Sequence, residues 1–376
     1  MRQIPFSPPH VGEKELSAVS EALKSGWLSM GPKTAEFETE FAKYVNAREA
    51  VAVNSCTSAL FLSLVVNGVR PRDEVITTPY TFAATANTIE HLGARPVFAD
   101  VEPGTLNIDP GEVESKITDN TKGIVVVHYA GQPADMGEIN GIAEKHGLFV
   151  NEDAAHAVGA EYEGRKIGSG RNLASFSFYA TKNLTTGEGG MITLEDGEKA
   201  ALLRKLRLHG MSRDAWKRYS GEGRWHYHIE HPGYKMNTTD INSALGLTQL
   251  AQIDEFNQRR AEIAERYREG LQDMDGISFL EMKNDRKTCN HLFPIFVSPE
   301  QRDGLIMSLA QAGIGASVHF IPLHIMPYYR DKYSYFEESY PVAFEAYRKE
   351  ISLPIYPDLS DDDISYVIDA LRKNLS

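Results

Sequence analysis

Cysteine is scarce in this sequence, and no hydrophobic run is long. Only Cys56 and Cys289 occur among 376 residues, without CxxC spacing, so neither a disulfide framework nor a structural zinc site is expected. The longest apolar patch, around ALFLSLVV, is far shorter than the roughly 20 residues that cross a bilayer, and the N-terminus has no signal-peptide core. We therefore expect no membrane partner, and a reducing cytoplasm is the simplest setting.

Positive charge is outnumbered, with a formal net charge of −13 at pH 7. Proteins that bind nucleic acids neutralise phosphates with clustered Lys and Arg, and no such cluster stands out here. We therefore expect no nucleic-acid partner, and the acidic balance favours solubility. With 42% hydrophobic residues, a chain of this length can bury a large core and usually divides into two domains.

Short β-branched runs alternate with longer amphipathic segments through the first two-thirds of the chain. EAVAVN, DEVITTP, KGIVVVHYA and GLFVNEDAA have the composition of strands. TSALFLSLVVNG and MGEINGIAEKHG have the pattern of helices that end at glycine. This alternation predicts a mostly parallel α/β sheet with helices on both faces.

The pattern changes after about residue 238. One long helix is predicted from there to about residue 272, and it would bridge two domains. Beyond it, strand-like HLFPIFV and helix-like QRDGLIMSLAQAG and DDDISYVIDALRKN predict a smaller α+β domain. We expect a large domain over residues 1–250 and a small C-terminal domain over residues 251–376.

Polar residues follow several predicted strands, and in open α/β sheets ligands bind at the carboxyl ends of strands. After VAVN, the run SCTSAL opens a helix whose N–H groups suit a phosphate, although Ser55 or Thr57 could simply cap that helix. After GLFVN, the run EDAAHA supplies Asp153 and His156, where the acid could also be a cap. After EVITTP, Phe82 could stack on a flat ring or pack in the core.

A fourth strand end carries a lysine. FSFYATKNLTTGEGG, residues 176–190, places Lys182 between a buried strand and a glycine-rich turn. A lysine desolvated there forms imines readily, whereas the alternative is a side chain that extends to the surface. An amine, a phosphate site, a carboxylate and an aromatic plate are together what pyridoxal phosphate requires. The four strand ends therefore indicate a pyridoxal-phosphate enzyme.

The same segments carry a family resemblance. EDAAHA, GSGRNLASFSFYATKNLTTGEGGMI and PGYKMNTTDINSALGLTQL resemble the DegT/DnrJ/EryC1/StrS family of sugar aminotransferases. The match runs nearly end to end, because SGWLSMGP, HFIPLH and LPIYPDLSDDDI also occur in the family's order. PGYK and VHYAGQPADM further resemble the branch that aminates UDP-4-ketopentose on the way to 4-amino-4-deoxy-L-arabinose.

The resemblance implies the aspartate-aminotransferase fold, fold type I, and a role for each matching residue. Lys182 would bind the cofactor covalently and, once released, act as the base that moves the substrate's proton. Asp153 would lie against the pyridine nitrogen and keep it protonated. Phe82 would stack on the ring, with His156 near the ring's hydroxyl side. The phosphate would be held by Thr57, Ser58 and Ser177.

The resemblance also implies a homodimer whose active sites are completed across the interface. Lys235 and Asn237 would reach the partner's phosphate, although many members have asparagine where this chain has Lys235. L-Glutamate would donate the amino group and leave as 2-oxoglutarate. A nucleotide-linked keto sugar would accept it, for a surface polysaccharide, lipopolysaccharide or lipid A.

The sugar nucleotide would need further contacts. Its diphosphate could be bound by TKNL, RLHGMSRDAWKR and the HFIPLH loop. Four side chains are candidate substrate contacts, and ordinary packing or surface exposure could explain each of them. They are Trp27, Glu188, His319 and His324.

Other functions fit the sequence less well. WHYHIEH gathers His226, His228 and His231, but strand spacing would place His231 on the opposite face, so a loop is favoured over a metal site. An NAD-dependent enzyme would need GxGxxG after the first strand, which SCTSAL does not provide. A non-catalytic sensor of cofactor or sugar is disfavoured by Lys182 and Asp153. Among enzymes, the alternative acceptor is a UDP-linked 4-keto-6-deoxy-N-acetylhexosamine.

Overall fold

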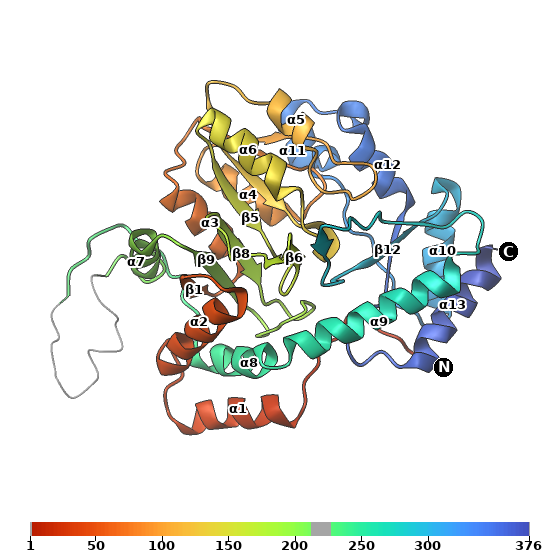
Figure 1. Ribbon diagram of the computed structural model, residues 1–376, viewed down its shortest axis with the longest axis horizontal. Helices are drawn as coiled ribbons and strands as arrows, with labels where there is room; N and C mark the ends of the chain where they lie inside the picture. The colour runs from red at the N-terminus through yellow and green to blue at the C-terminus, as the bar shows by residue number, and fades with distance from the viewer. Residues whose placement is uncertain (1, 212–226, 376) are drawn as a thin grey trace.

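The computed structural model describes residues 2–211 and 227–375 and is built around a seven-stranded sheet. The strands of this sheet are β1 (Glu49–Val53), β2 (Glu74–Thr77), β3 (Arg95–Phe98), β4 (Thr121–Val127), β5 (Phe149–Asp153), β8 (Leu173–Ser177) and β9 (Gly190–Leu194). Their spatial order is β1-β9-β8-β5-β4-β2-β3. Figure 1 labels four of them, β1, β9, β8 and β5. Only β9 is antiparallel to its neighbours, so the mostly parallel sheet predicted from the alternation is confirmed.

Helices cover both faces of this sheet, which is why its strands are continuous apolar runs. Helices α3 (Cys56–Val66), α4 (Ala83–His91) and α7 (Gly197–Leu206) pack on one face. Helices α2 (Pro32–Val45), α5 (Pro110–Ser115) and α6 (Met136–His146) pack on the other. Within β1, Val51 and Val53 join the α3 cluster, whereas Ala50 and Ala52 join the α2 cluster, as the alternation of side chains along a strand requires.

The helical stretch expected over residues 238–272 is two helices. They are α8 (Asp240–Leu250), on which α1 (Glu13–Lys24) packs, and α9 (Ile253–Leu271). The break falls at Ala251 and Gln252, where the φ of Gln252 is −116° and its ψ is 0°. Gln249 and Gln252 both donate hydrogen bonds to the buried Glu15 carboxylate of α1, at 3.1 and 2.8 Å, so the chain turns where α1 holds it.

A smaller α+β part follows and has its own core. Its antiparallel sheet contains β10 (Ser278–Phe279), β12 (Phe293–Phe296) and β13 (Glu350–Leu353). Helices α9, α10 (Pro299–Gln311) and α13 (Asp361–Leu375) pack on it, and both chain ends lie near this part (Figure 1). Ile4 also belongs to this core and pairs with Ile314. The expected division into domains 1–250 and 251–376 stays a prediction.

The remaining helices and strands are short. They are α11 (Pro327–Tyr333), α12 (Pro341–Lys349) and a small sheet of β6 (Glu161–Tyr162), β7 (Arg165–Lys166) and β11 (Arg286–Lys287). In the described residues, no helix is both long and apolar enough to cross a membrane.

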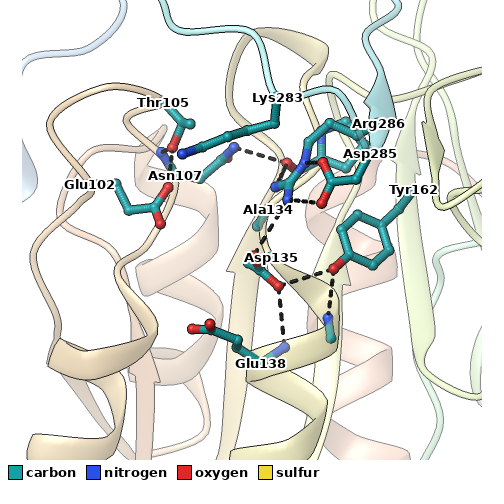
Figure 2. Close-up of polar contacts among 12 residues, drawn as sticks. Glu102, Thr105, Asn107, Ala134, Asp135, Glu138, Tyr162, Lys283, Asp285 and Arg286 are labelled. Carbon is teal, nitrogen blue, oxygen red and sulfur yellow. Dashed lines mark hydrogen bonds and ion pairs between the residues drawn. The ribbon is translucent and has the colours of Figure 1, made fainter.

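A polar cluster joins β11 to the loop that precedes α6 (Figure 2). Arg286 donates a hydrogen bond to the Pro133 carbonyl at 3.0 Å, and its guanidinium lies 5.0 Å from the centre of the Tyr162 ring. The Tyr162 hydroxyl donates to Asp135 at 3.0 Å, and Asp135 caps α6 by accepting the Glu138 N–H at 3.2 Å. This cluster fixes the loop at the carboxyl end of β4.

Candidate active site

A cavity of about 470 Å³ opens at the carboxyl ends of β1, β2, β4, β5 and β8. Its wall includes residues that follow these strands. Phe6 and Ser7, from the N-terminal segment, also line it. The predicted site residues that line it are Thr57, Phe82, Asp153, His156, Ser177, Lys182, Glu188 and His319. One cavity therefore gathers the predicted amine, carboxylate, hydroxyls and aromatic ring.

Lys182 lies in the loop between β8 and β9, where its N–H donates to the Tyr179 carbonyl at 3.0 Å. Its amino group is 3.4 Å from Nε2 of His291. Burial lowers the pKa of Lys182 from its ordinary 10.5 to about 8. A substantial fraction of its amino groups is therefore unprotonated near neutral pH, which is the form that attacks an aldehyde.

Asp153 is the last residue of β5 and is buried. Its Oδ2 accepts a hydrogen bond from Thr85 Oγ1 at 2.7 Å, and its Oδ1 accepts the Ala155 N–H at 3.2 Å. Burial raises the pKa of the Asp153 carboxyl above its ordinary value. A protonated ring nitrogen beside this carboxyl would compensate the burial of its negative charge.

Two histidines stand beside the lysine. The rings of His156 and His291 are 4.3 Å apart, and burial lowers the pKa of each imidazole well below its ordinary value. Nδ1 of His291 lies 2.9 Å from Oδ1 of Asn183, so Nδ1 carries the proton and Nε2 can accept from Lys182. Nδ1 of His156 is buried and has no hydrogen-bond partner within residues 2–211 and 227–375.

The phosphate position predicted at SCTSAL is the N-terminus of α3. Ser55 caps this helix by accepting the Ser58 N–H at 3.1 Å. Ser58 Oγ donates to Asn54 at 2.7 Å, so this hydroxyl is used within the turn and does not line the cavity. Thr57 and Ser177 do line it, and the first N–H groups of a helix have no partner within the helix.

Gly190 places β9 directly against this turn. A Cβ at that position would lie 2.6 Å from the carbonyl carbon of Ser55 and 2.8 Å from the nitrogen of Cys56. Within TGEGG, only Gly187 has a positive φ, of 77°. The loop therefore uses one glycine for a turn and another for close approach of two backbones.

These residues fit pyridoxal phosphate. Asp153 is a buried carboxyl that needs a positive partner, and the Nδ1 atom of His156 lacks a hydrogen-bond partner in the described chain. Lys182 is an amine with a lowered pKa, and the α3 terminus and its hydroxyls suit a phosphate. Phe82 is 66% exposed on the same wall and is free to cover a planar ring.

Four other predicted residues lie outside the cavity wall. His324 is fully buried, with Nε2 3.2 Å from the Glu337 carbonyl, and the Trp27 indole covers Gly31. Lys235 is exposed, and Asn237 donates to the Thr238 carbonyl at 2.9 Å.

The Lys235–Asn237 segment nevertheless lies beside the phosphate turn of its own chain. The Met236 carbonyl between these two residues accepts the Asn54 N–H at 2.9 Å. This contact places the segment at the edge of the turn. The side chains of Lys235 and Asn237 do not line the cavity of their own chain.

Part of the sequence analysis falls outside the described residues. His226 and most of RLHGMSRDAWKR lie within residues 212–226, which the structure does not describe. Among residues 2–211 and 227–375, no group of three or more His, Cys, Asp or Glu side chains could hold a metal ion.

His291, Thr85 and Phe6 are site residues that the sequence analysis missed. His291 precedes β12 rather than following a strand of the main sheet, so the strand-end rule does not select it. Thr85 lies inside α4, and Phe6 comes from a segment without regular secondary structure. The fold, rather than a local sequence pattern, brings these three residues to the cavity.

Comparisons with known proteins agree with this chemistry. The model of the DegT/DnrJ/EryC1/StrS aminotransferase family matches residues 9–372. The chain is 51% identical over 374 residues to the spore coat polysaccharide biosynthesis protein SpsC of Bacillus subtilis, a match that covers 98% of this chain and 96% of that protein.

Solved structures are similar over the whole chain. A putative sugar aminotransferase from Streptococcus pneumoniae in its PMP form has a TM-score of 0.94 and 36% identity, with 99% of both chains covered. Its PLP form has a TM-score of 0.93 and 35% identity, with 100% of both chains covered. Helicobacter pylori PseC, an aminotransferase involved in the biosynthesis of pseudoaminic acid, has a TM-score of 0.92 and 31% identity, covering 100% of this chain and 99% of that one. These likenesses confirm the expected α/β architecture of fold type I with a smaller C-terminal α+β part.

Proposed function

Because this chain belongs to the DegT/DnrJ/EryC1/StrS aminotransferase family and is a PLP-dependent sugar aminotransferase, we propose that it transfers the amino group of L-glutamate to a nucleotide-linked keto sugar. The observation that carries the proposal is the pairing of Lys182 and Asp153 in one cavity. The Lys182 amine, with a pKa of about 8, would react with the aldehyde of the cofactor, and the buried Asp153 carboxyl would meet its pyridine nitrogen.

When bound, the cofactor supplies an electron sink, so that a C–H bond next to the transferred nitrogen can lose its proton. Lys182 would bind the cofactor and, when free, take that proton and return it to the carbon on the other side of the transferred nitrogen. His291 accepts from the lysine amino group and so holds it on the cavity side. Asp153 would keep the ring nitrogen protonated, while Thr57, Ser177 and the α3 N–H groups would bind the phosphate.

For the acceptor sugar, we propose a UDP-linked 4-keto sugar used in a surface polysaccharide. The name of SpsC, a spore coat polysaccharide biosynthesis protein, supports a polysaccharide as the destination. UDP-4-ketopentose, with lipid A as the destination of its amino product, and a UDP-4-keto-6-deoxy-N-acetylhexosamine are the two acceptors to compare. Both would pass Phe82 and His319 on the cavity wall.

We also propose a cytoplasmic homodimer in which Lys235 and Asn237 complete the partner's phosphate site. The exposure of Lys235 and the position of its segment beside the Asn54 turn support this arrangement. The two free thiols, Cys56 and Cys289, are consistent with a reducing setting.

The experiment that tests the function is a visible absorption spectrum of the protein loaded with pyridoxal phosphate, before and after L-glutamate is added without sugar. We expect the band of the lysine-bound cofactor to disappear and the band of the pyridoxamine form to grow. Adding each keto sugar should then restore the first band only for a true acceptor. A bound cofactor that ignores glutamate would contradict the proposed donor, and failure to bind it would contradict the proposed site.

A further inference from the structure

His319 holds a fixed position on the cavity wall. Its ring stacks on Phe6, with centroids 5.3 Å apart and planes 19° apart, and it meets the edge of Phe320. The Tyr129 hydroxyl donates to the His319 carbonyl at 2.6 Å. Burial and the positive charge of Lys182 lower the pKa of His319 to about 4, so near neutral pH its ring is uncharged and carries one proton.

Two residues of β13 bind this histidine from behind. Nδ1 of His319 is 3.0 Å from Ser352 Oγ, which is hydrogen-bonded to Oε1 of Glu350. The other carboxyl oxygen, Oε2, accepts the His319 N–H at 2.8 Å. Glu350 and Ser352 are both fully buried, and their side chains share a face because they are two positions apart on a strand. In the described part of the chain, Nε2 of His319 has no hydrogen-bond partner.

This chain of hydrogen bonds allows two proton arrangements. When Glu350 is protonated, its Oε1–H donates to Ser352 Oγ, the Ser352 hydroxyl donates to Nδ1, and Nε2 carries the ring proton. When Glu350 is ionised, Nδ1–H donates to Ser352 Oγ, the hydroxyl donates to Oε1, and Nε2 is a bare acceptor. The two arrangements differ by one proton, which leaves from Nε2 while Glu350 and Ser352 each pass a proton along the chain.

We propose that Glu350 and Ser352 are positioning residues that select the tautomer of His319, and thereby decide whether Nε2 offers the sugar substrate a hydrogen-bond donor or an acceptor. The inference rests on the proposed function only for the identity of the substrate at Nε2. With Glu350 protonated, Nε2–H would donate to a ketone or hydroxyl oxygen of the substrate. If Nε2 gave up its proton, Glu350 and Ser352 would pass one to Nδ1, so the His319 ring would stay neutral and no buried imidazolium would form.

The surroundings of Glu350 favour the protonated form. The charged and titratable groups around it are Arg302 of α10, Tyr80, Tyr129 and His319. Arg302 is ion-paired with Asp303 at 2.8 Å. Burial raises the pKa of Glu350 to about 8, against the opposing effect of its hydrogen bonds and of Arg302. Near neutral pH the donor arrangement is therefore the main one.

The test reads the tautomer of His319 by ¹⁵N NMR of the histidine-labelled holoenzyme without sugar, at about pH 6.5 and about pH 9.5. We expect the Nε2–H form at the lower pH and the Nδ1–H form at the higher pH. Glu350→Gln keeps an acceptor for the His319 N–H and always donates to Ser352, so it should hold the Nε2–H form at both pH values. In Ser352→Ala the tautomer should no longer follow pH.

His324, which is buried outside the cavity, is the internal control, and its signals should be the same in all three proteins. A wild-type tautomer that does not change with pH would overturn the proposal, as would a Glu350→Gln enzyme that changes like the wild type. If a variant fails to fold, the wild-type comparison still decides. A normal tautomer change in an enzyme that aminates no keto sugar would overturn the proposed function alone.

Discussion

Lys182 acquires its reactivity from its surroundings. Burial, rather than a neighbouring cation, is the main cause of its lowered pKa, and His291 is the one side chain in the described residues that is hydrogen-bonded to its amino group. A surface lysine with a pKa near 10.5 is almost entirely protonated at pH 7, whereas Lys182 has a sizeable unprotonated fraction. If Lys182 is the cofactor lysine, this difference would make attachment to it selective.

Borohydride should therefore fix pyridoxal phosphate onto Lys182. Because the pKa is lowered, the free-amine form increases as the pH rises through about 8, and the rate of attachment should increase over the same range. Peptide mass spectrometry after reduction at several pH values measures this. Lys182→Arg should abolish the label, and Lys122→Arg, at an exposed position of β4, should leave it unchanged. A label on a different lysine would remove the assignment.

Of the residues that line the cavity, the sequence analysis predicted several that follow strands of the main sheet and missed others that come from elsewhere in the chain. Asp153, Lys182 and Thr57 lie in the cavity because the carboxyl ends of parallel strands meet at one edge of the sheet. His291 and Phe6 reach the same cavity from the C-terminal part and the N-terminal segment, and no local pattern records such long-range packing. The roles assigned to these residues remain predictions.

Among the structural elements, β9 packs against the turn that is predicted to bind phosphate. It runs between β1 and β8, and Gly190 at its start lies against the Ser55 turn. Its antiparallel direction could not be read from the sequence, because a buried strand is a continuous apolar run whichever way it runs. The connection from β8 to β9, residues 178–189, contains Lys182 and no helix that would carry the chain back to the other end of the sheet, and the two strands pair antiparallel.

Gly190→Ala should weaken cofactor binding. Its Cβ would lie 2.6 Å from Ser55 backbone atoms, so the turn must move. If binding must bear a strain of about 1–3 kcal/mol, affinity falls by roughly 5-fold to 150-fold. A titration of cofactor-free protein with pyridoxal phosphate measures this. Gly304→Ala in α10 is the matched control, because its Cβ meets nothing within 4 Å and should leave affinity unchanged while stabilising the helix by about 0.5–1 kcal/mol. Equal affinities for both variants would contradict this account of Gly190.

The VHYAGQPADM segment illustrates why the sequence does not identify the sugar. His128 is buried against Glu152 at 3.1 Å, Gln132 donates to the Glu281 carbonyl at 3.0 Å, and Asp135 belongs to the Arg286 cluster (Figure 2). These side chains hold the loop to the rest of the fold and do not line the cavity. Likeness in this segment therefore reports on shared architecture, and the choice between pentose and hexosamine substrates requires the assay.

In the whole molecule, the proposed dimer can be tested by complementation. Chains with Lys182→Ala are mixed with chains that carry Lys235→Ala and Asn237→Ala, and mixed dimers are isolated. If sites are shared, one site of each mixed dimer has both native parts, so about half of the wild-type activity should return. The unmixed parents are the controls and should each be inactive. No recovery in verified mixed dimers would contradict shared sites.

The alternation of strands and helices was sufficient to predict the main sheet and the smaller C-terminal part. It was insufficient to place residues 238–272, because the contact of Gln252 with α1 that breaks the helix joins distant segments. Periodicity describes how a segment buries its apolar face. It contains no information on a single hydrogen bond such as the one from the Gln252 side chain to Glu15 of α1.

The pairing of Ile4 with Ile314 has a consequence for the order in which the molecule is built. Phe6 and Ser7 leave the ribosome early, yet Ile314, which pairs with the neighbouring Ile4, is made only when the C-terminal part is synthesised. The sheet that carries Lys182 and Asp153 can form earlier. The wall behind His319 is therefore the last piece of this cavity to be assembled, and a nascent chain cannot complete the proposed sugar site before its synthesis is almost finished.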